Sequence, residues 1–105
     1  MTIEIRFLLI MRNKKLFRSN FYQWLSENRH IFEEFERRAL KVAQFRHHYS
    51  ARTIIETMRH DTVIRELSGD WKLNNNYTPC QARLFSLMHP QFKDLFEFRA
   101  QKVAA

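Results

Sequence analysis

HIFEEFERRALKVAQFRH, residues 30–47, is the stretch with the clearest helical periodicity in this chain of 105 residues. Its apolar side chains recur at intervals of three and four residues, so they fall on one face of a helix. That face consists of Ile31, Phe32, Phe35, Ala39, Val42 and Phe45. Glutamates come early and arginines come late, which is the charge order that stabilises a helix dipole. The stretch therefore predicts an amphipathic helix over 30–47.

Two pairs of opposite charge support this helix. Glu33 lies four residues before Arg37, and Glu34 lies four residues before Arg38. At this spacing and polarity, a pair stabilises an exposed helix by about 0.2–0.5 kcal/mol. We expect both pairs to contribute.

A shorter helix is indicated on the N-terminal side. Asn20 is a residue type that caps helices, and residues 21–28 place Phe21, Trp24 and Leu25 on one face. On the C-terminal side, Ser50 is a suitable cap for a helix over 51–67, and the helix would stop before the chain's single glycine.

Two more helical segments follow. Thr78 can cap a helix over 79–89, with Pro79 at the first helical position, where its missing N–H costs nothing. Residues 91–103 again show helical spacing, although FEFRA, residues 96–100, would also suit a terminal strand.

These segments predict a mainly α fold, a compact bundle of about five helices in a single domain over 1–105. A short extended piece near residues 71–73 would supply a β-pair and give the second half a winged-helix-like arrangement. The helical core is expected over 20–99, and residues 1–19 are expected to form an extension, or a short strand followed by a basic segment.

The strand is suggested by the start of the chain. Ile3, Ile5, Phe7 and Leu9 alternate with other residues, which is the period of a strand. The apolar run that ends at Met11 is too short to span a bilayer, so we expect no membrane insertion. Either of the first two methionines is a plausible natural start.

The overall charge favours an anionic partner. Lysines and arginines outnumber acids by 18 to 11, which gives a net charge of +7 and a pI near 10.1. Such a balance fits nucleic acid, an acidic protein or an anionic membrane surface as the partner.

A lone cysteine, Cys80, excludes a disulfide within the chain and suggests the reducing cytoplasm, that of a bacterial cell on the resemblance described below. We place it in the first turn of a helix, where the dipole would lower its thiol pKa. No base lies at a recognisable spacing, so we interpret Cys80 as a small packing residue.

The densest positive charge lies in RRALKVAQFRHHYSAR, residues 37–52, which contains no acid. It spans the end of one predicted helix, a short turn and the start of the next, a layout similar to a helix-turn-helix corner. The expected phosphate contacts are Arg37, Arg38, Lys41, Arg46, His47, His48 and Arg52. The alternative is a solvated corner whose cations complement a helix C-terminus.

A second candidate surface lies in KLNNNYTPCQARLF, residues 72–85. Asparagine amides contact phosphates or base edges, tyrosine stacks on bases, and a helix start presents free N–H groups to anions. The expected contacts are Lys72, Asn74, Asn75, Asn76, Tyr77 and Arg83. The alternative is structural: the asparagines form a tight turn without glycine, and Tyr77 packs on the new helix.

Residue patterns for catalysis and metal binding are weak. His47 and His48 are adjacent, so on a helix they point about 100° apart and do not share a metal ion. No glycine-rich loop and no recognisable nucleophile and base pair occur. We expect no enzyme activity, no cofactor and no metal site.

The chain resembles small helical proteins of tailed phages and prophages over about residues 20–99. The resemblance is carried by SARTIIETMRH, WKLNNNYTPCQARLF and HPQF. It implies a phage gene product acting in a bacterial cytoplasm, a setting in which small proteins act as DNA-binding regulators or as inhibitors of host defence, including anti-CRISPR proteins.

Two functions are therefore expected. The first is a non-enzymatic regulator that binds nucleic acid through the arginine-rich helix corner. The alternative is an anti-CRISPR-like inhibitor that binds an acidic host protein or a nucleoprotein complex, and surplus Phe and Trp side chains would also allow a homodimer.

Overall fold

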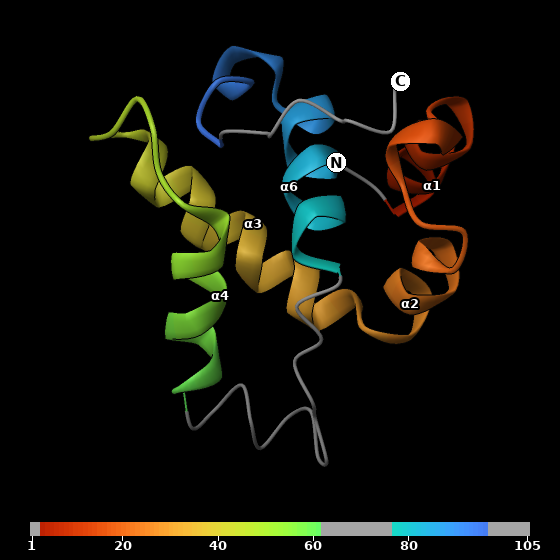
Figure 1. The fold of residues 1–105 in the computed structure, drawn as a ribbon, viewed down its shortest axis with the longest axis horizontal. Coiled ribbons are helices and arrows are strands. Elements are labelled where there is room, and N and C mark those ends of the chain that lie inside the picture. Colours follow the sequence, from red (N-terminus) through yellow and green to blue (C-terminus); the bar gives the residue numbers. More distant parts are fainter. Residues whose placement is uncertain (1–2, 62–76, 97–105) are drawn as a thin grey trace, which may run out of the picture.

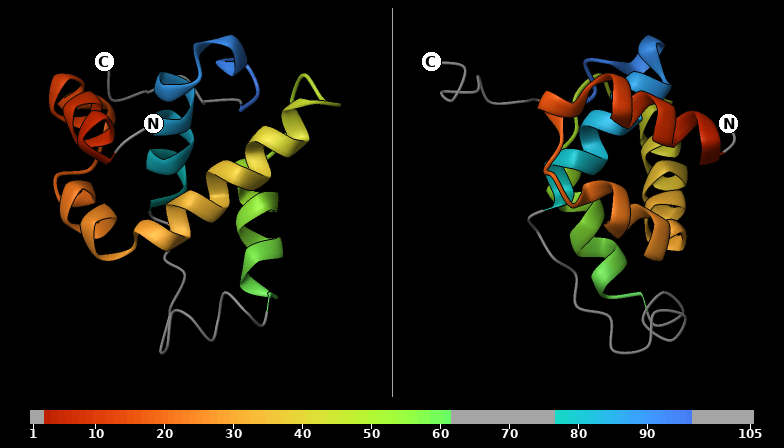
Figure 2. Two further views of the ribbon diagram at one scale, coloured as in Figure 1. Left: turned by 180° about the vertical axis from the view of Figure 1, so that it is seen from behind. Right: turned by 90° about the vertical axis from the view of Figure 1, so that its right-hand side faces the viewer.

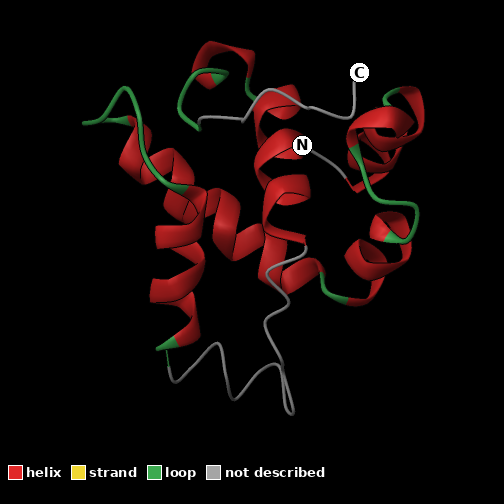
Figure 3. Cartoon of the chain, in the orientation of Figure 1, coloured by secondary structure: helices red, strands yellow, loops and turns green. Residues whose placement is uncertain are grey.

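The computed structural model describes residues 3–61 and 77–96, which form helices joined by short turns, with no strand in either stretch (Figures 1 and 3). The α-helices of this described part are α1 (Ile3–Arg12), α2 (Phe21–Glu27), α3 (Arg29–Ala43), α4 (Ala51–Arg59) and α6 (Thr78–Met88). Two 3-10 turns, η1 (Lys14–Leu16) and η3 (Pro90–Phe92), follow α1 and α6. The prediction of a mainly α bundle of about five helices is confirmed. The region expected to carry the β-pair, near 71–73, lies outside the described residues.

Helix α6 lies at the centre of the bundle. It contacts α1, α3 and α4, and Figure 1 shows it between α4 on one side and α1 on the other. Helix α3 crosses behind both α4 and α6, and the reverse view in Figure 2 places it in front of them. This arrangement brings the starts of α4 and α6 to one side of the molecule.

Helix α3 is the amphipathic helix predicted from the sequence. Its buried side chains are Ile31, Phe32, Phe35 and Ala39. It ends at Ala43 instead of 47, because the N–H groups of Phe45 and Arg46 bond to the carbonyl oxygen of Val42 in a closing turn. Phe45 consequently leaves the apolar face and is 74 % exposed.

The prediction of a strand at residues 3–9 is wrong, because this segment is helix α1. Its side chains are apolar on nearly every side, so their sequence fits either period, and tertiary contacts decide between them. Arg6 and Ile10, four residues apart, form the buried side of α1. Arg6 donates to Glu33 at 3.0 Å and to Glu36 at 3.3 Å, both on α3.

Two helix starts behave differently from each other. The Oγ of Ser50 accepts a hydrogen bond from the Thr53 N–H at 3.2 Å, so its capping role is confirmed. The expected Thr78 cap is displaced by one residue: Tyr77 occupies the cap position, and Thr78 begins α6 without a bond from its hydroxyl. Residues 93–96 form turns and bends after η3, so a helix from 91 onward is wrong for that part.

Aromatic side chains fill the space between α2 and the start of α6. The rings of Phe17 and Phe21 stack at 5.4 Å, and Trp24 stacks on Tyr77 at 5.0 Å. Tyr77 is buried in this stack. Tyr77 therefore packs in the core as the structural alternative expected, but its ring partners Phe21 and Trp24 belong to α2 instead of the new helix.

Candidate nucleic-acid interface

The first two arginines of the basic corner are held in ion pairs. Arg37 bonds to Glu34 through both Nε and Nη2, with the Nε bond at 2.9 Å. Arg38 bonds to Glu34 at 2.6 Å and reaches across to Asp61 at the end of α4 at 2.7 Å. Much of their charge is therefore neutralised within the protein, although Arg37 stays largely exposed.

The pairing partly matches the helical spacing. The Glu34–Arg38 pair is confirmed, whereas Arg37 pairs with Glu34 in place of Glu33. Glu33 instead accepts from Arg6 on α1. The ion pair between Glu33 and Arg6 of α1 thus replaces the expected pair of Glu33 with Arg37. Glu34 consequently pairs with both Arg37 and Arg38.

Because Glu34 accepts hydrogen bonds, first from Arg37 and then from Arg38, its pKa is lowered from 4.5 to about 2. The ionised form is stabilised in the folded state, so its contribution is present above pH 4.5 and is lost as the pH falls toward 2. We expect Glu34→Gln to lower the free energy of unfolding by about 1–2 kcal/mol at neutral pH. Urea unfolding from pH 7 downward should show the difference from wild type shrinking through this acidic window.

A suitable control is Glu27→Gln, because Glu27 is exposed and accepts only from Gln23 among the hydrogen bonds of the described residues. Its effect should be small at every pH. If Glu34→Gln lowered the free energy of unfolding by the same amount at every pH down to 2, the assignment of the lowered pKa to the two ion pairs would be contradicted.

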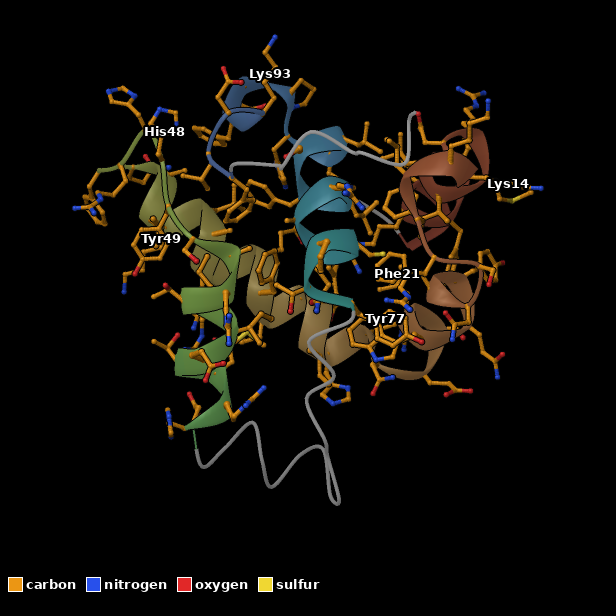
Figure 4. The ribbon with its side chains drawn as sticks, in the orientation of Figure 1. Lys14, Phe21, His48, Tyr49, Tyr77 and Lys93 are labelled. Carbon is orange, nitrogen blue, oxygen red and sulfur yellow. The ribbon has the colours of Figure 1, made fainter. Side chains whose placement is uncertain are left out.

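The turn after α3 is fastened to the segment that follows α6. Tyr49 N–H donates to the Leu95 carbonyl oxygen at 2.8 Å, and His48 Nδ1 lies 3.0 Å from the Asp94 carbonyl oxygen. The Arg46 guanidinium lies 5.8 Å from the Tyr49 ring centre. Figure 4 shows His48 and Lys93 at the same end of the molecule. Lys93 thus adds an exposed cation that the sequence interpretation missed.

A cleft of about 680 Å³ lies between the starts of α4 and α6. The turn before α4 contributes His48, α4 contributes Arg52, and α6 contributes Arg83. Its full lining is His48, Tyr49, Ser50, Ala51, Arg52, Thr78, Pro79, Ala82, Arg83 and Phe96. The structure therefore brings together residues from both of the surfaces predicted separately from the sequence.

In this cleft the side chains of His48, Arg52 and Arg83 lie beside the N-terminal ends of α4 and α6. The first N–H groups of a helix have no partner within the helix, and they carry the positive end of its dipole. The Thr78 hydroxyl, in the first turn of α6, is buried and has no hydrogen-bond partner among the described residues. A phosphate is the kind of group that such a combination attracts.

Arg83 links this cleft to the η1 turn. It donates to the Leu16 carbonyl oxygen at 3.1 Å, which holds its guanidinium on the surface of α6. The nearby Cys80 accepts from the Arg18 N–H at 3.5 Å. Burial raises the pKa of the Cys80 thiol, and this outweighs the opposite effects of that bond and of the Arg83 and Arg18 charges. The expected lowering of this pKa by the helix dipole is therefore wrong, whereas Cys80 is buried in the core.

The remaining predicted residues are distributed as follows. Lys41, Arg46, His47 and Arg52 are exposed, and none of them forms an ion pair in the described part of the chain. Lys72 and the three asparagines, Asn74, Asn75 and Asn76, lie outside the described residues. The exposed corner contacts without an ion pair within the described ranges are thus Lys41, Arg46, His47 and Arg52, whereas Arg37, Arg38 and His48 bond within the protein.

A second basic group was not assigned a role from the sequence. It consists of Arg12, Lys14, Lys15 and Arg18, all exposed and without an ion pair among the residues described. A signal for it exists in the sequence, since no acid occurs between Glu4 and Glu27. It lies around η1, where Leu16 meets Arg83.

Within 3–61 and 77–96, no three His, Cys, Asp or Glu side chains are grouped as metal ligands. The described helices are also too short and too polar for any one of them to traverse a bilayer.

No protein-family model, curated protein or solved structure matches this chain, so the cleft is interpreted from its own geometry and charge.

Proposed function

We propose that the protein binds nucleic acid without catalysing a reaction and acts as a regulator. The phosphates of the nucleic-acid strand bind at the cleft between α4 and α6 and along the adjacent turn after α3. The observation that carries this proposal is the convergence of His48, Arg52 and Arg83 on one cleft with two helix starts.

The distribution of cations without an ion pair in the described stretches favours a chain of phosphates over a single small anion. Arg52 lies in the cleft, Lys41 and Arg46 lie beside the turn, and Lys93 lies near His48. Arginine offers a planar set of donors that matches phosphate oxygens. Several phosphate contacts of this kind give affinity without reading base sequence.

Salt dependence tests the proposal. We expect fluorescein-labelled oligonucleotides of about 20 nucleotides, single- and double-stranded, to bind with affinity that falls steeply with salt, by about 0.7–0.9 log units per phosphate contact for each log unit of salt. The double variant Arg46→Ala/Arg52→Ala removes two expected contacts, so the slope should become less steep by about 1.4–1.8. Fluorescence anisotropy at several salt concentrations measures both quantities.

The matched control is Arg12→Ala/Arg29→Ala, which removes the same charge from exposed positions outside the cleft. It should leave the slope nearly unchanged. Absence of binding at low salt, or an affinity independent of salt, would refute the proposal. An equal loss in both double variants would refute the cleft as the binding site.

A second candidate function is inhibition of a bacterial defence system through a protein contact. The observation that favours it is the exposed apolar side of α1, where Ile5, Leu8 and Met11 face outward. A complex with a bacterial protein that survives nuclease treatment in a pull-down would support this function, whereas a complex lost on nuclease treatment would support the first.

A further inference from the structure

Helix α1 exposes several apolar side chains and buries a charged one beside Ile10. Its buried side contains Arg6, which is 6 % exposed, whereas Ile5, Leu8 and Met11 are 42 %, 46 % and 55 % exposed. A helix on the surface of a globular protein normally turns its polar side outward. Figure 2 shows α1 at the outside of the bundle, and no described element covers this face.

A groove begins at the end of this apolar face. It has a volume of about 580 Å³ and lies between α1, η1 and the start of α2. Its lining consists of Ile10, Met11, Lys14, Phe17, Arg18, Ser19 and Tyr22. Ile10 and Phe17 are buried side chains of the core, whereas Met11 and Tyr22 are about half exposed. The Tyr22 ring is supported by Phe7, with ring centres 4.3 Å apart.

The border of the groove is positively charged. Lys14 and Arg18 line it directly, and Arg12 and Lys15 are exposed close by in the chain. None of these side chains forms an ion pair within the described residues. An apolar hollow surrounded by unpaired cations complements a ligand that is apolar at its centre and acidic at its edges.

The charge and the hollow shape favour a peptide over two other occupants. In a symmetric dimer the same surface meets itself, so two copies of this positively charged border would be brought into one interface. A bilayer surface is flat and presents no single side chain to enter a hollow bordered by Tyr22 and Met11. A peptide segment fits both the hollow and its positive border. One large apolar side chain can fill the groove while carboxylates on either side meet the cations.

We propose that the groove between α1, η1 and α2 binds an acidic amphipathic segment of a partner protein. A Leu, Phe or Trp side chain of that segment enters the groove, and its Asp or Glu neighbours pair with Lys14 and Arg18. This proposal does not depend on nucleic-acid binding at the cleft, which uses other residues.

A displayed library of random peptides tests it. Peptides of about 12 residues are selected on the wild-type protein, and the enriched sequences are synthesised and measured by fluorescence anisotropy. We expect enriched peptides to combine acidic residues with large apolar ones and to bind with Kd values of about 1–100 µM, typical of a small transient interface. Lys14→Glu/Arg18→Glu should weaken them at least about tenfold.

Met11→Ser tests the apolar contact, and a similar loss is expected because Met11 lines the groove without belonging to the core. Arg46→Glu/Arg52→Glu is the matched charge reversal on the opposite surface and should leave peptide affinity unchanged. Circular dichroism of each variant verifies the fold.

Three results would overturn the proposal. The first is a selection that enriches no acidic peptides, or that enriches peptides which bind the Lys14→Glu/Arg18→Glu variant as tightly as the wild-type protein. The second is binding to phosphatidylserine vesicles through Met11 in the absence of peptide binding. The third is a concentration-dependent dimer, detected by ultracentrifugation, that Met11→Ser abolishes.

Discussion

Glu36→Leu is expected to lower the free energy of unfolding by about 3 kcal/mol, because it breaks a largely buried polar network from its centre. One carboxylate oxygen of Glu36 accepts from Arg6 at 3.3 Å, and the other lies 2.7 Å from His89 Nε2. The Arg6 side chain is only 7 % exposed and stacks on the Phe32 ring. Without Glu36, this buried guanidinium keeps a single acidic partner among the described residues, Glu33.

A double-mutant cycle separates this network from simple loss of packing. Arg6→Met alone should also destabilise, whereas Arg6→Met/Glu36→Leu should recover much of the loss, since no buried charge is left without its partner. The control is Glu33→Leu, which removes the other partner of Arg6. Glu33 is 54 % exposed, so its loss should cost less than about 1 kcal/mol. Equal costs for Glu33→Leu and Glu36→Leu in urea unfolding would contradict the central role of Glu36.

Phe85→Ala should destabilise the protein by about 4 kcal/mol, because removal of the ring leaves a cavity in the core beside the central helix α6. Phe85 is fully buried in α6. Its ring meets Phe96 edge-on at 5.4 Å and lies 4.8 Å from the His89 ring. Domains of this size have a total stability of about 5–15 kcal/mol, so the variant loses a large part of it. Thermal and urea unfolding measure the change.

Phe45→Ala is the matched control for this substitution. The same side-chain atoms are removed at a position that is 74 % exposed, and the expected change is within about 0.5 kcal/mol. If both variants lost the same free energy, the placement of α6 at the centre of the core would be wrong.

The longest helix was predictable because its pattern is local. Residues 30–47 show apolar spacing and charge order that agree with each other, and α3 occupies most of that range. Ser50 was predictable for the same reason, since a cap acts within one turn. Helix α1 was not, because an almost entirely apolar segment fits both helical and strand periods. This helix packs against α6, and Arg6 bonds to Glu33 of α3, twenty-seven residues away along the chain, so its environment is set by tertiary structure.

The candidate site was predictable only as two separate lists of residues. Arg52 and Arg83 belong to different segments, and they line one cleft because α4 packs against α6. Sequence spacing indicated the pair of Glu34 and Arg38 but not the reach of Arg38 to Asp61. The loss of free charge at Arg37 and Arg38 therefore depended on tertiary structure. The basic group around η1 was visible in the composition of residues 5–26, yet its role follows only from the groove beside it.

The fastening of Tyr49 to Leu95 has a consequence for biosynthesis. Phe96 lines the cleft, and the turn bearing His48 is held by the carbonyl oxygens of residues 94 and 95. On the ribosome, Arg52 emerges long before these residues do. The lining of the cleft is therefore incomplete until residues 94–96 have also left the exit tunnel.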